Sequence, residues 1–364
     1  MEYRLSKLKD ITTYIARGIT PKYTEDLTGL CVINQKCIRD YKLLLENARR
    51  HDISKKQITD EKVVQKYDIL INSTGVGTAG RVVQNFENQI ITADSHVTIV
   101  RPDSNKINPI YLGYAVKNQQ KYIEGLAEGS TGQTEISRQR IGEEILIKFP
   151  TDKQVQKMIS GFLLNIDEKI KLNNQINDNL KKFIFNQYEK VSQNIETEVE
   201  LDAITNISSG KRPKIKNDNL SIPIIGASGT MSYTNDSNYN KDIIIIGRVG
   251  TLGVVQRYNY SIWASDNTIT IDTKYKNYIE NYLKTVDYTG LNRGSTQPLL
   301  TQSDIGKQKI KFDKNIVENF ESNIQVFKNK IWNNINENTK LEELRDTLLP
   351  KLMNGEIDLD NIKL

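Results

Sequence analysis

The chain has 364 residues, of which 37% are hydrophobic and 26% are charged, and its formal net charge is +5. This composition is typical of a soluble globular protein with two domains and excludes an intrinsically disordered chain. The longest aliphatic run, residues 243–246, is too short to span a bilayer, and the charged N-terminal segment lacks the apolar region of a signal peptide. Two cysteines and two histidines are too few for a structural zinc site or a disulfide framework, so we expect no metal and a cytoplasmic location.

Residues 75–80, with the sequence GVGTAG, match the GxGxxG pattern of a dinucleotide-binding loop. Such a loop requires a helix directly after it, because the amides at the start of that helix bind the pyrophosphate. Residues 81–100 instead alternate in polarity and are rich in β-branched side chains, which predicts strands. We therefore expect these glycines to form a tight β-turn with positive φ angles and to bind no nucleotide.

The tetrapeptide Asn108-Pro-Ile-Tyr111 resembles the NPPY motif with which amino-methyltransferases hold a flipped base. The second proline is missing, and no strand–glycine loop–helix unit for S-adenosylmethionine precedes it. We expect a helix start, with Asn108 as the cap and Pro109 in the first turn. The sequence contains no P-loop, GxSxG, HExxH or nuclease motif, so we identify no catalytic residues.

The second half of the chain repeats the first in the same order. Residues 18–22 match 210–214, residues 77–80 match 250–253, and TADSHVTI matches ASDNTITI. Each half then has a Gly-Ser-Thr-Gln segment, a short strand and a long helical segment. Arg248 replaces the first glycine of the GxGxxG pattern in the second copy. These matches indicate an internal duplication.

The two helical segments, near residues 155–191 and 315–352, have apolar side chains spaced by three and four residues. Asparagines interrupt both apolar stripes, and at such positions asparagine fixes register and partner choice. Each helix would be roughly 50 Å long, too long for one small domain, so we expect the two to pair antiparallel. The predicted seam consists of Ile159, Phe162, Ile166, Ile176, Leu180, Phe183, Phe320, Ile324, Phe327, Ile331, Leu341 and Leu348.

The expected fold is therefore a multidomain α+β protein, with two globular mixed α/β domains joined by an antiparallel coiled coil. The domains should span residues 1–150 and 194–312. The first spacer helix should lie within 151–193, and the second helix and a C-terminal tail within 313–364.

With these features the chain resembles the specificity (S) subunit of type I restriction–modification systems over essentially its whole length. The resemblance is carried by INQKCIRDY…NARRHDI, by GSTGQTEISRQRIGEEILIKFP and GSTQPLLTQSDIGKQKIKF, and by LEELRDTLLPKLMNGEI. It implies a non-catalytic subunit whose two target-recognition domains read a bipartite, asymmetric site on double-stranded DNA. It also implies two methyltransferase (M) subunits carrying S-adenosylmethionine, restriction (R) subunits using ATP and Mg, and no cofactor in this chain.

Candidate DNA contacts are cations expected in loops, since lysine and arginine neutralise phosphates and longer polar side chains reach base edges. Arg248 is the preferred base reader, because the first copy has no cation at that turn. The Gly-Ser-Thr-Gln segments are candidate phosphate donors, and a solvated surface role is the alternative for each cation. The candidates are Arg17, Lys22, Lys36, Arg39, Arg49, Arg50, Lys55, Lys56, Arg81, Lys211, Arg212, Lys214, Lys216, Arg248 and Arg257.

Two other functions remain open from the sequence. A stand-alone DNA-binding regulator would use the same two-domain architecture without methyltransferase partners, and copurification distinguishes it from an S subunit. A fused methyltransferase or nuclease is disfavoured because its motifs are missing.

Overall fold

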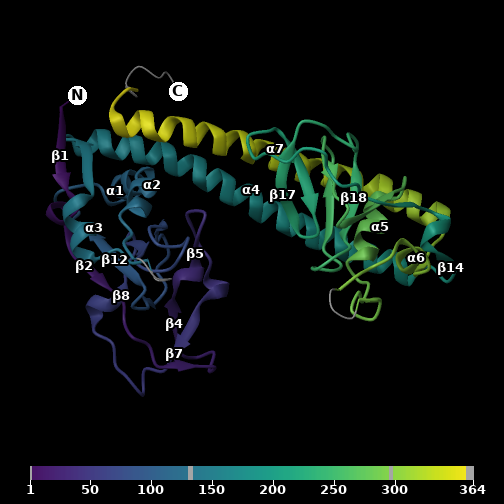
Figure 1. Cartoon of the computed structure of the whole chain (residues 1–364), viewed down its shortest axis with the longest axis horizontal. Coiled ribbons are helices and arrows are strands. Elements are labelled where there is room, and N and C mark those ends of the chain that lie inside the picture. Colours follow the sequence, from purple (N-terminus) through teal and green to yellow (C-terminus); the bar gives the residue numbers. More distant parts are fainter. Residues whose placement is uncertain (1, 130–133, 295–297, 358–364) are drawn as a thin grey trace. The chain divides into compact units, whose positions relative to one another are not determined.

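The computed structural model describes residues 2–129, 134–294 and 298–357. The chain forms two compact units: unit 1 comprises Met1–Lys171 and Asn338–Leu364, and unit 2 comprises Leu172–Glu337. Each unit contains one α/β domain together with part of helix α4 (Lys153–Gln193) and part of helix α7 (Lys314–Asn354) (Figure 1). The predicted Gly-Ser-Thr-Gln segments lie largely outside the described residues. No helix in the described ranges is both long and apolar enough to cross a membrane.

Unit 1 is built on a four-stranded sheet, β10-β9-β12-β2, and a five-stranded sheet, β3-β7-β4-β11-β8. Two further pairs, β1-β13 and β5-β6, complete its strands. The central strands β9 and β12 are rich in isoleucine and valine, which suits strands buried on both faces. The strands are β1 (Tyr3–Lys7), β2 (Thr12–Arg17), β3 (Tyr23–Thr24), β4 (Leu30–Ile33), β5 (Ile38–Arg39), β6 (Lys42–Leu43), β7 (Arg49–His51), β8 (Val63–Val64), β9 (Ile69–Asn72), β10 (Val82–Gln84), β11 (Ile91–Ala93), β12 (Val97–Pro102) and β13 (Leu146–Pro150), and the short helices are α1 (Pro109–Asn118), α2 (Gln120–Gly125) and α3 (Arg138–Glu144).

Unit 2 repeats this plan with fewer strands. Its sheets have the orders β15-β21-β18-β19 and β17-β16-β20, and β14 pairs with β22. The elements are β14 (Glu198–Glu200), β15 (Asn206–Ser209), β16 (Ile222–Gly226), β17 (Gly229–Thr234), β18 (Ile243–Gly247), β19 (Val255–Tyr258), β20 (Trp263–Ala264), β21 (Thr268–Asp272), β22 (Lys309–Lys311), α5 (Lys276–Leu283) and α6 (Gln302–Gly306).

The predicted duplication is confirmed by strand order and strand direction. Both four-stranded sheets have an antiparallel hairpin at one edge, β9–β10 and β18–β19. In the five-stranded sheet of unit 1 and the three-stranded sheet of unit 2, the middle strand pairs parallel on one side, β4 with β11 and β16 with β20, and antiparallel on the other. The two units therefore share one arrangement of two sheets, with matching strand order and strand direction.

One glycine in each unit lies where two backbone segments cross. Gly18 donates its amide hydrogen to the Val97 carbonyl at 2.9 Å, and Gly210 donates to the Thr268 carbonyl at 3.0 Å. A Cβ atom on Gly18 would lie 2.0 Å from the Ala93 carbonyl oxygen, and one on Gly210 would lie 2.1 Å from that of Ser265. No side chain fits at these distances, so both copies require glycine there.

The glycine-rich segment 75–80 is a turn, as predicted. Gly75, Gly77 and Gly80 have φ angles of 108°, 68° and 88°, and the segment joins the antiparallel strands β9 and β10. A strand rather than a helix follows it, so the helix N-terminus that a dinucleotide requires is not there. The matching Gly250 and Gly253 also have positive φ.

The segment at Asn108 is a helix start, also as predicted. The Asn108 side-chain oxygen accepts a hydrogen bond from the Tyr111 amide at 2.9 Å, and Pro109 is the first residue of α1. Tyr111 is fully buried and donates its hydroxyl to the Lys148 carbonyl. These residues cap and pack a helix.

Helices α4 and α7 contain 41 residues each, so each is about 60 Å long. They pair antiparallel in both units. In unit 1, Asp167 of α4 is 2.7 Å from Arg345 of α7. Further along α4, in unit 2, Asn177 accepts a hydrogen bond at 2.8 Å from Asn334, which comes earlier in α7. The partners therefore move in opposite directions along the two helices, which confirms the predicted antiparallel coiled coil.

The buried stripe of α4 differs from the predicted seam in its second half. Ile176 is half-buried and Phe183 is 42% exposed, although the centre of its ring lies 5.0 Å from that of Phe327. Their neighbours Asn177 and Ile184 occupy the buried positions. Of the other seam residues, Ile159, Ile166, Phe320, Ile324 and Ile331 are buried, and Phe162, Leu180, Phe327, Leu341 and Leu348 are half-buried.

We predict that Gly210→Ala destabilises unit 2 by about 1–3 kcal/mol, because the new methyl group meets backbone that must shift. Both tryptophans, Trp263 and Trp332, lie in unit 2, so the urea midpoint of tryptophan fluorescence reports this change. Gly161→Ala, in the part of α4 that belongs to unit 1, is the control: its Cβ meets nothing within 4 Å and alanine favours the helix, so the tryptophan midpoint of unit 2 should not fall. Equal midpoints for the two variants would contradict the crossing-point role of Gly210.

Candidate nucleic-acid interface

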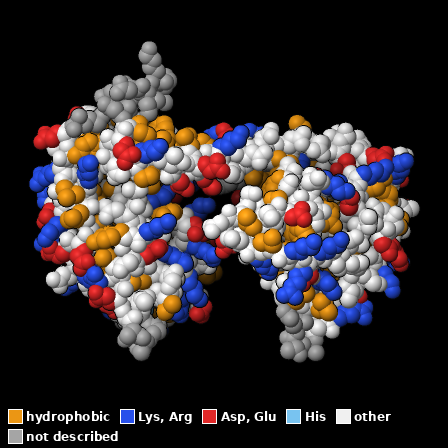
Figure 2. Space-filling view, turned by 45° about the horizontal axis from the view of Figure 1, so that its top comes forward, with side chains coloured by type: hydrophobic (Ala, Val, Ile, Leu, Met, Phe, Trp, Pro, Cys, Tyr) orange, Lys and Arg blue, Asp and Glu red, His pale blue; other side chains and the backbone are white. Residues whose placement is uncertain are grey.

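The segment between β15 and β16 presents four cations from a fixed backbone. The Lys211 amide donates to the Ala264 carbonyl at 2.9 Å, and the Trp263 indole donates to the Lys211 carbonyl at 2.6 Å. Pro213 is buried and anchors the middle of the segment. Figure 2 shows Lys and Arg side chains on the face of unit 2 seen there. Within the described residues, no ion pair or side-chain hydrogen bond engages the exposed Lys211, Arg212, Lys214 or Lys216. Unpaired cations on a fixed segment create a positive potential that attracts polyanions.

Arg248 lies at the end of β18, beside the turn that carries Gly250. Its amide donates to the Asn267 carbonyl at 2.9 Å, and its carbonyl accepts from the Leu300 amide at 3.0 Å. The side chain is half-buried and its Nε donates to the Leu300 carbonyl at 3.3 Å. The backbone is thus fixed on both sides, while the guanidinium has further N–H groups for a partner. Base reading by Arg248 stays a prediction.

Arg257 does not lie on an accessible surface, which corrects its assignment as a candidate DNA contact. Its side chain is 3% exposed and lies 2.6 Å from Asp242 and 2.9 Å from Glu280. Lys328 of α7 also contacts Glu280, at 2.7 Å. Burial alone would raise the pKa of Glu280, but the charges of Lys328, Lys284 and Arg257 hold it well below its usual value. Arg257 thus belongs to a buried ion-pair network that joins β19 to α5 and α7.

The first cationic cluster of unit 1 surrounds strand β7. Arg49 is exposed, and its guanidinium carbon lies 3.3 Å from the centre of the Tyr23 ring. Arg50 donates to the Gly29 carbonyl at 3.2 Å. Lys22 is exposed, Lys55 pairs with Asp52 at 3.3 Å, and Lys56 donates to the Thr20 carbonyl at 3.0 Å. The structure therefore brings these five candidates together around β3 and β7.

Three other candidates of unit 1 lie away from β7. Lys36 is exposed on a short 3₁₀ turn, and Arg39 is exposed with Asp40 3.5 Å away. Arg81 donates to the Gly77 carbonyl at 2.8 Å and lines a cavity of about 500 Å³ that also contains Asp40 and Glu124. Because carboxylates repel phosphates, this cavity is a poor site for a nucleic-acid backbone.

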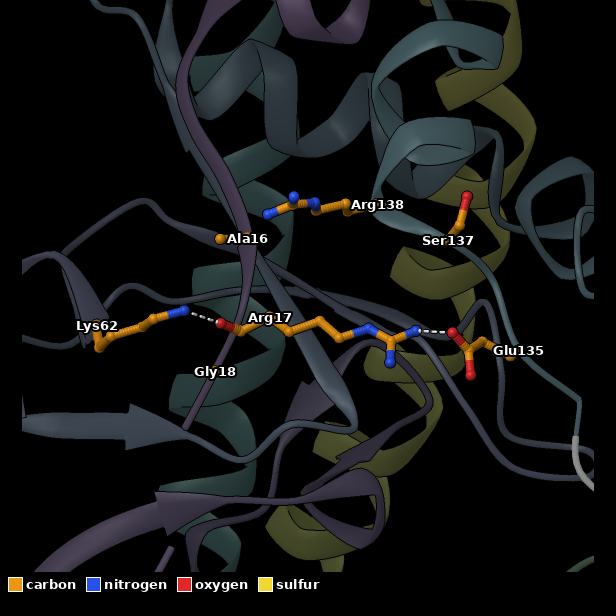
Figure 3. Close-up of a pocket in the computed structure, with 7 residues that line it drawn as sticks. All are labelled: Ala16, Arg17, Gly18, Lys62, Glu135, Ser137 and Arg138. Atoms are coloured by element: carbon orange, nitrogen blue, oxygen red, sulfur yellow. Dashed lines mark hydrogen bonds and ion pairs between the residues drawn. The ribbon is translucent and has the colours of Figure 1, made fainter. Parts of the chain in front are cut away.

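Arg17 lines a smaller pocket of about 340 Å³ at the end of β2. Its guanidinium forms an ion pair with Glu135, and its carbonyl accepts from Lys62 (Figure 3). Arg138 of α3 lines the same pocket. The sequence interpretation missed Lys62 and Arg138, since neither lies in a cationic run. Their shared pocket becomes visible only in the fold.

Within the described residues, no group of three His, Cys, Asp or Glu side chains is placed to hold a metal ion. Burial raises the pKa of Cys37 to about 11 and also raises that of Cys31, so neither thiol is activated.

Two α/β units on one plan, each with a part of the same pair of long helices, define a protein with an internal duplication. The family model of the type I restriction modification DNA specificity domain matches residues 2–182 and 194–340, and the chain belongs to this family.

Two specificity subunits of Methanocaldococcus jannaschii are similar in sequence. The putative type I restriction enzyme MjaX specificity subunit is 24% identical over 199 residues, which span 50% of this chain and 45% of that relative, about half its length. The type I restriction enzyme MjaIX specificity subunit is 23% identical, with 99% of this chain and 95% of that relative covered. The crystal structure of the type I restriction–modification system S subunit from M. genitalium has the same fold, with a TM-score of 0.61 and 20% identity over 97% of this chain and 96% of that one.

We predict that Arg257→Met destabilises unit 2 by about 3–5 kcal/mol, because Asp242 and Glu280 lose their buried partner. Since the pKa of Glu280 is depressed, its stabilising effect is complete above the ordinary carboxyl pKa and is lost as the pH falls below it. Urea titrations of tryptophan fluorescence at neutral and acidic pH measure both effects.

The matched comparison for Arg257→Met is Lys211→Ala. This variant should leave stability within about 0.5 kcal/mol, weaken binding to all DNA sequences and reduce the salt slope by about one. A stable Arg257→Met protein with an altered DNA preference would restore Arg257 as a DNA contact.

Proposed function

We propose that this chain is the non-catalytic DNA-reading subunit of a type I restriction–modification complex. The observation that carries the proposal is the repeated framework whose connecting segments differ between the two copies. In unit 1, residues 34–48, which include the β5–β6 hairpin, connect β4 to β7. In unit 2 the corresponding strands β16 and β17 are joined by only residues 227 and 228. A retained framework with different loops suits two readers of two different half-sites.

The same proposal assigns each unit one half of a bipartite, asymmetric site on double-stranded DNA. Unit 1 would use the cations around β7, and unit 2 would use Lys211, Arg212, Lys214, Lys216 and Arg248. The helices would set the number of unread base pairs between the half-sites, since α4 continues without interruption from residue 153 to residue 193.

The helices also support a docking role for two methyltransferase subunits. Each unit exposes large apolar side chains on them: Met158 and Leu344 in unit 1, and Leu172 and Val326 in unit 2 are 45–64% exposed. Exposed apolar side chains on otherwise charged helices are typical of protein–protein contacts. In this proposal the methyltransferase subunits supply S-adenosylmethionine and the catalytic residues, and restriction subunits supply ATP-driven and Mg-dependent chemistry. A stand-alone regulator would leave these helix faces free.

We predict that the purified chain transfers no labelled methyl group from S-adenosylmethionine to DNA, and that methylation appears when its methyltransferase subunits are added. Val326→Asp should reduce copurification of those subunits at least tenfold, because it places a charge in an apolar contact. Leu27→Asp, which changes an 81% exposed leucine on a loop of unit 1, is the control and should copurify normally. Sequence-specific methylation by the chain alone would refute the proposal.

The spacer-setting role of the helices predicts the effect of an insertion. Four residues added near Asn173 lengthen α4 by about 6 Å, slightly more than one turn. Since base pairs rise about 3.4 Å, the unread spacer of the methylated motif should grow by one or two base pairs. Affinity should fall, because α7 must adapt, and both half-site sequences should persist. Methylome sequencing measures this, and an active variant with an unchanged spacer would show that the helices do not set the distance.

A further inference from the structure

Strand β17 is an edge strand with an apolar exposed side. It pairs antiparallel with β16, and within the described residues no further strand pairs with its outer edge. The register shifts between Ile224 and Ile225, so that Met231 is the extra residue of a β-bulge. A bulge redirects a side chain locally. Met231 is 46% exposed and Tyr233 is 36% exposed.

The cationic segment of residues 211–216 leads into a stretch that runs along this strand. The Asn217 amide donates to the Tyr233 carbonyl at 3.0 Å, and the Ser232 hydroxyl donates to Asp218 at 2.8 Å. Tyr260, 44% exposed, lies in the bend after β19, where it interacts electrostatically with Tyr233 of β17, and its ring centroid is 5.6 Å from that of Tyr258. On the face of unit 2 visible in Figure 2, hydrophobic side chains lie beside Lys and Arg side chains. Two exposed apolar side chains, Met231 and Tyr233, beside four unpaired cations suit a ligand that has both negative charges and apolar groups. DNA has phosphates along its backbone and thymine methyl groups in its major groove.

Strand β7 is the corresponding strand of unit 1, with cationic in place of apolar side chains, and the two-residue strand β3 pairs with its outer edge. Strand β7 pairs antiparallel with β4, which pairs parallel with β11, just as β17 pairs with β16 and β16 with β20. Its residues are Arg49, Arg50 and His51, whereas β17 has the sequence GTMSYT, in which the bulged Met231 has no counterpart in β7. The guanidinium of Arg49 is exposed and stacked on Tyr23. Stacking holds the planar group in one orientation, which reduces the entropy lost on binding.

We propose that β7 and β17 are the base-reading strands and that they read by different chemistry: Arg49 donates hydrogen bonds to a guanine, whereas Met231 contacts the C5-methyl group of a thymine. The inference rests on the proposed function, since it requires a chain that reads DNA. The major groove admits a two-stranded ribbon and displays both the thymine methyl group and the guanine N7 and O6 acceptors. The cations of residues 211–216 then contact phosphates beside that groove.

The experiment uses the full chain with its methyltransferase subunits and a fluorescent duplex that carries the motif methylated in cells. Each thymine of the motif is replaced in turn by deoxyuridine, which lacks only the methyl group. At one position of one half-site, the affinity of the unaltered protein should fall about fourfold, because the complex no longer buries that methyl group. The Met231→Ala protein should bind both duplexes equally, and Met231→Leu should restore the difference. Ile90→Ala, which changes an isoleucine of unit 1 that is 75% exposed, should behave as the unaltered protein.

The second arm replaces each guanine by 7-deazaguanine, which lacks the N7 acceptor. At one position of the other half-site, affinity should fall at least fivefold for the unaltered protein and not at all for Arg49→Ala. Arg4→Ala, at an exposed arginine of β1, is the control and should retain the loss. Met231→Ala should also retain it, because that change lies in the other unit.

Three results would overturn the inference. The first is a loss of affinity for the deoxyuridine duplex that persists in Met231→Ala. The second is a loss of sequence preference in the same half-site for both Met231→Ala and Arg49→Ala. The third is a half-site that loses its sequence preference in Met231→Ala but contains no A·T pair. The proposed function survives all three, provided the unaltered complex prefers its motif to a scrambled duplex. If it shows no such preference, both the function and the inference fail.

Discussion

The fold depends on apolar side chains that helices α4 and α7 contribute to both cores. In unit 1, Ile159 and Leu163 of α4 and Leu352 of α7 belong to the main buried cluster. In unit 2, Ile184 of α4 and Phe320 of α7 do the same. Neither α/β domain therefore closes its core with its own strands and short helices. Because each helix contributes side chains to both cores, a change that separates the two helices should destabilise both α/β domains and the helix pair itself.

The polar residues of the helix pair act within this constraint. Asn177 and Asn334 are buried and hydrogen-bonded to each other at 2.8 Å, and Asn173 donates to Glu337 at 2.8 Å. An apolar seam permits several sliding registers of similar energy, whereas a buried amide pair is satisfied in only one. The helix pair thus buries less apolar surface than a fully apolar seam would, but it has one preferred register.

Much of the architecture followed from the sequence because the signals were local or repeated. The cap at Asn108, the turn at Gly77 and the two long helices each depend on neighbouring residues. The residues whose predicted positions were wrong are held by residues that are distant in the sequence. The apolar character of Phe183 predicts a place in the seam, but Ile184 has the buried position, because the partner helix decides which side of the apolar stripe it covers. The sequence predicts a surface position for Arg257, since nothing near it in the sequence reveals that Asp242 and Glu280 enclose it.

The chain path has a consequence for the order of folding. Unit 2 is one continuous segment, residues 172–337, whereas unit 1 is assembled from two segments with unit 2 inserted between them. Leu352 and Met353, which are buried in the core of unit 1, are synthesised after the whole of unit 2. Domains usually fold in the order of their synthesis, from the N-terminus onwards. Here unit 2 can complete its core while unit 1, whose synthesis starts earlier, still lacks part of its core. All of unit 2 must leave the ribosome before unit 1 is complete, and until then the apolar core side chains of unit 1 stay exposed to water or to chaperones.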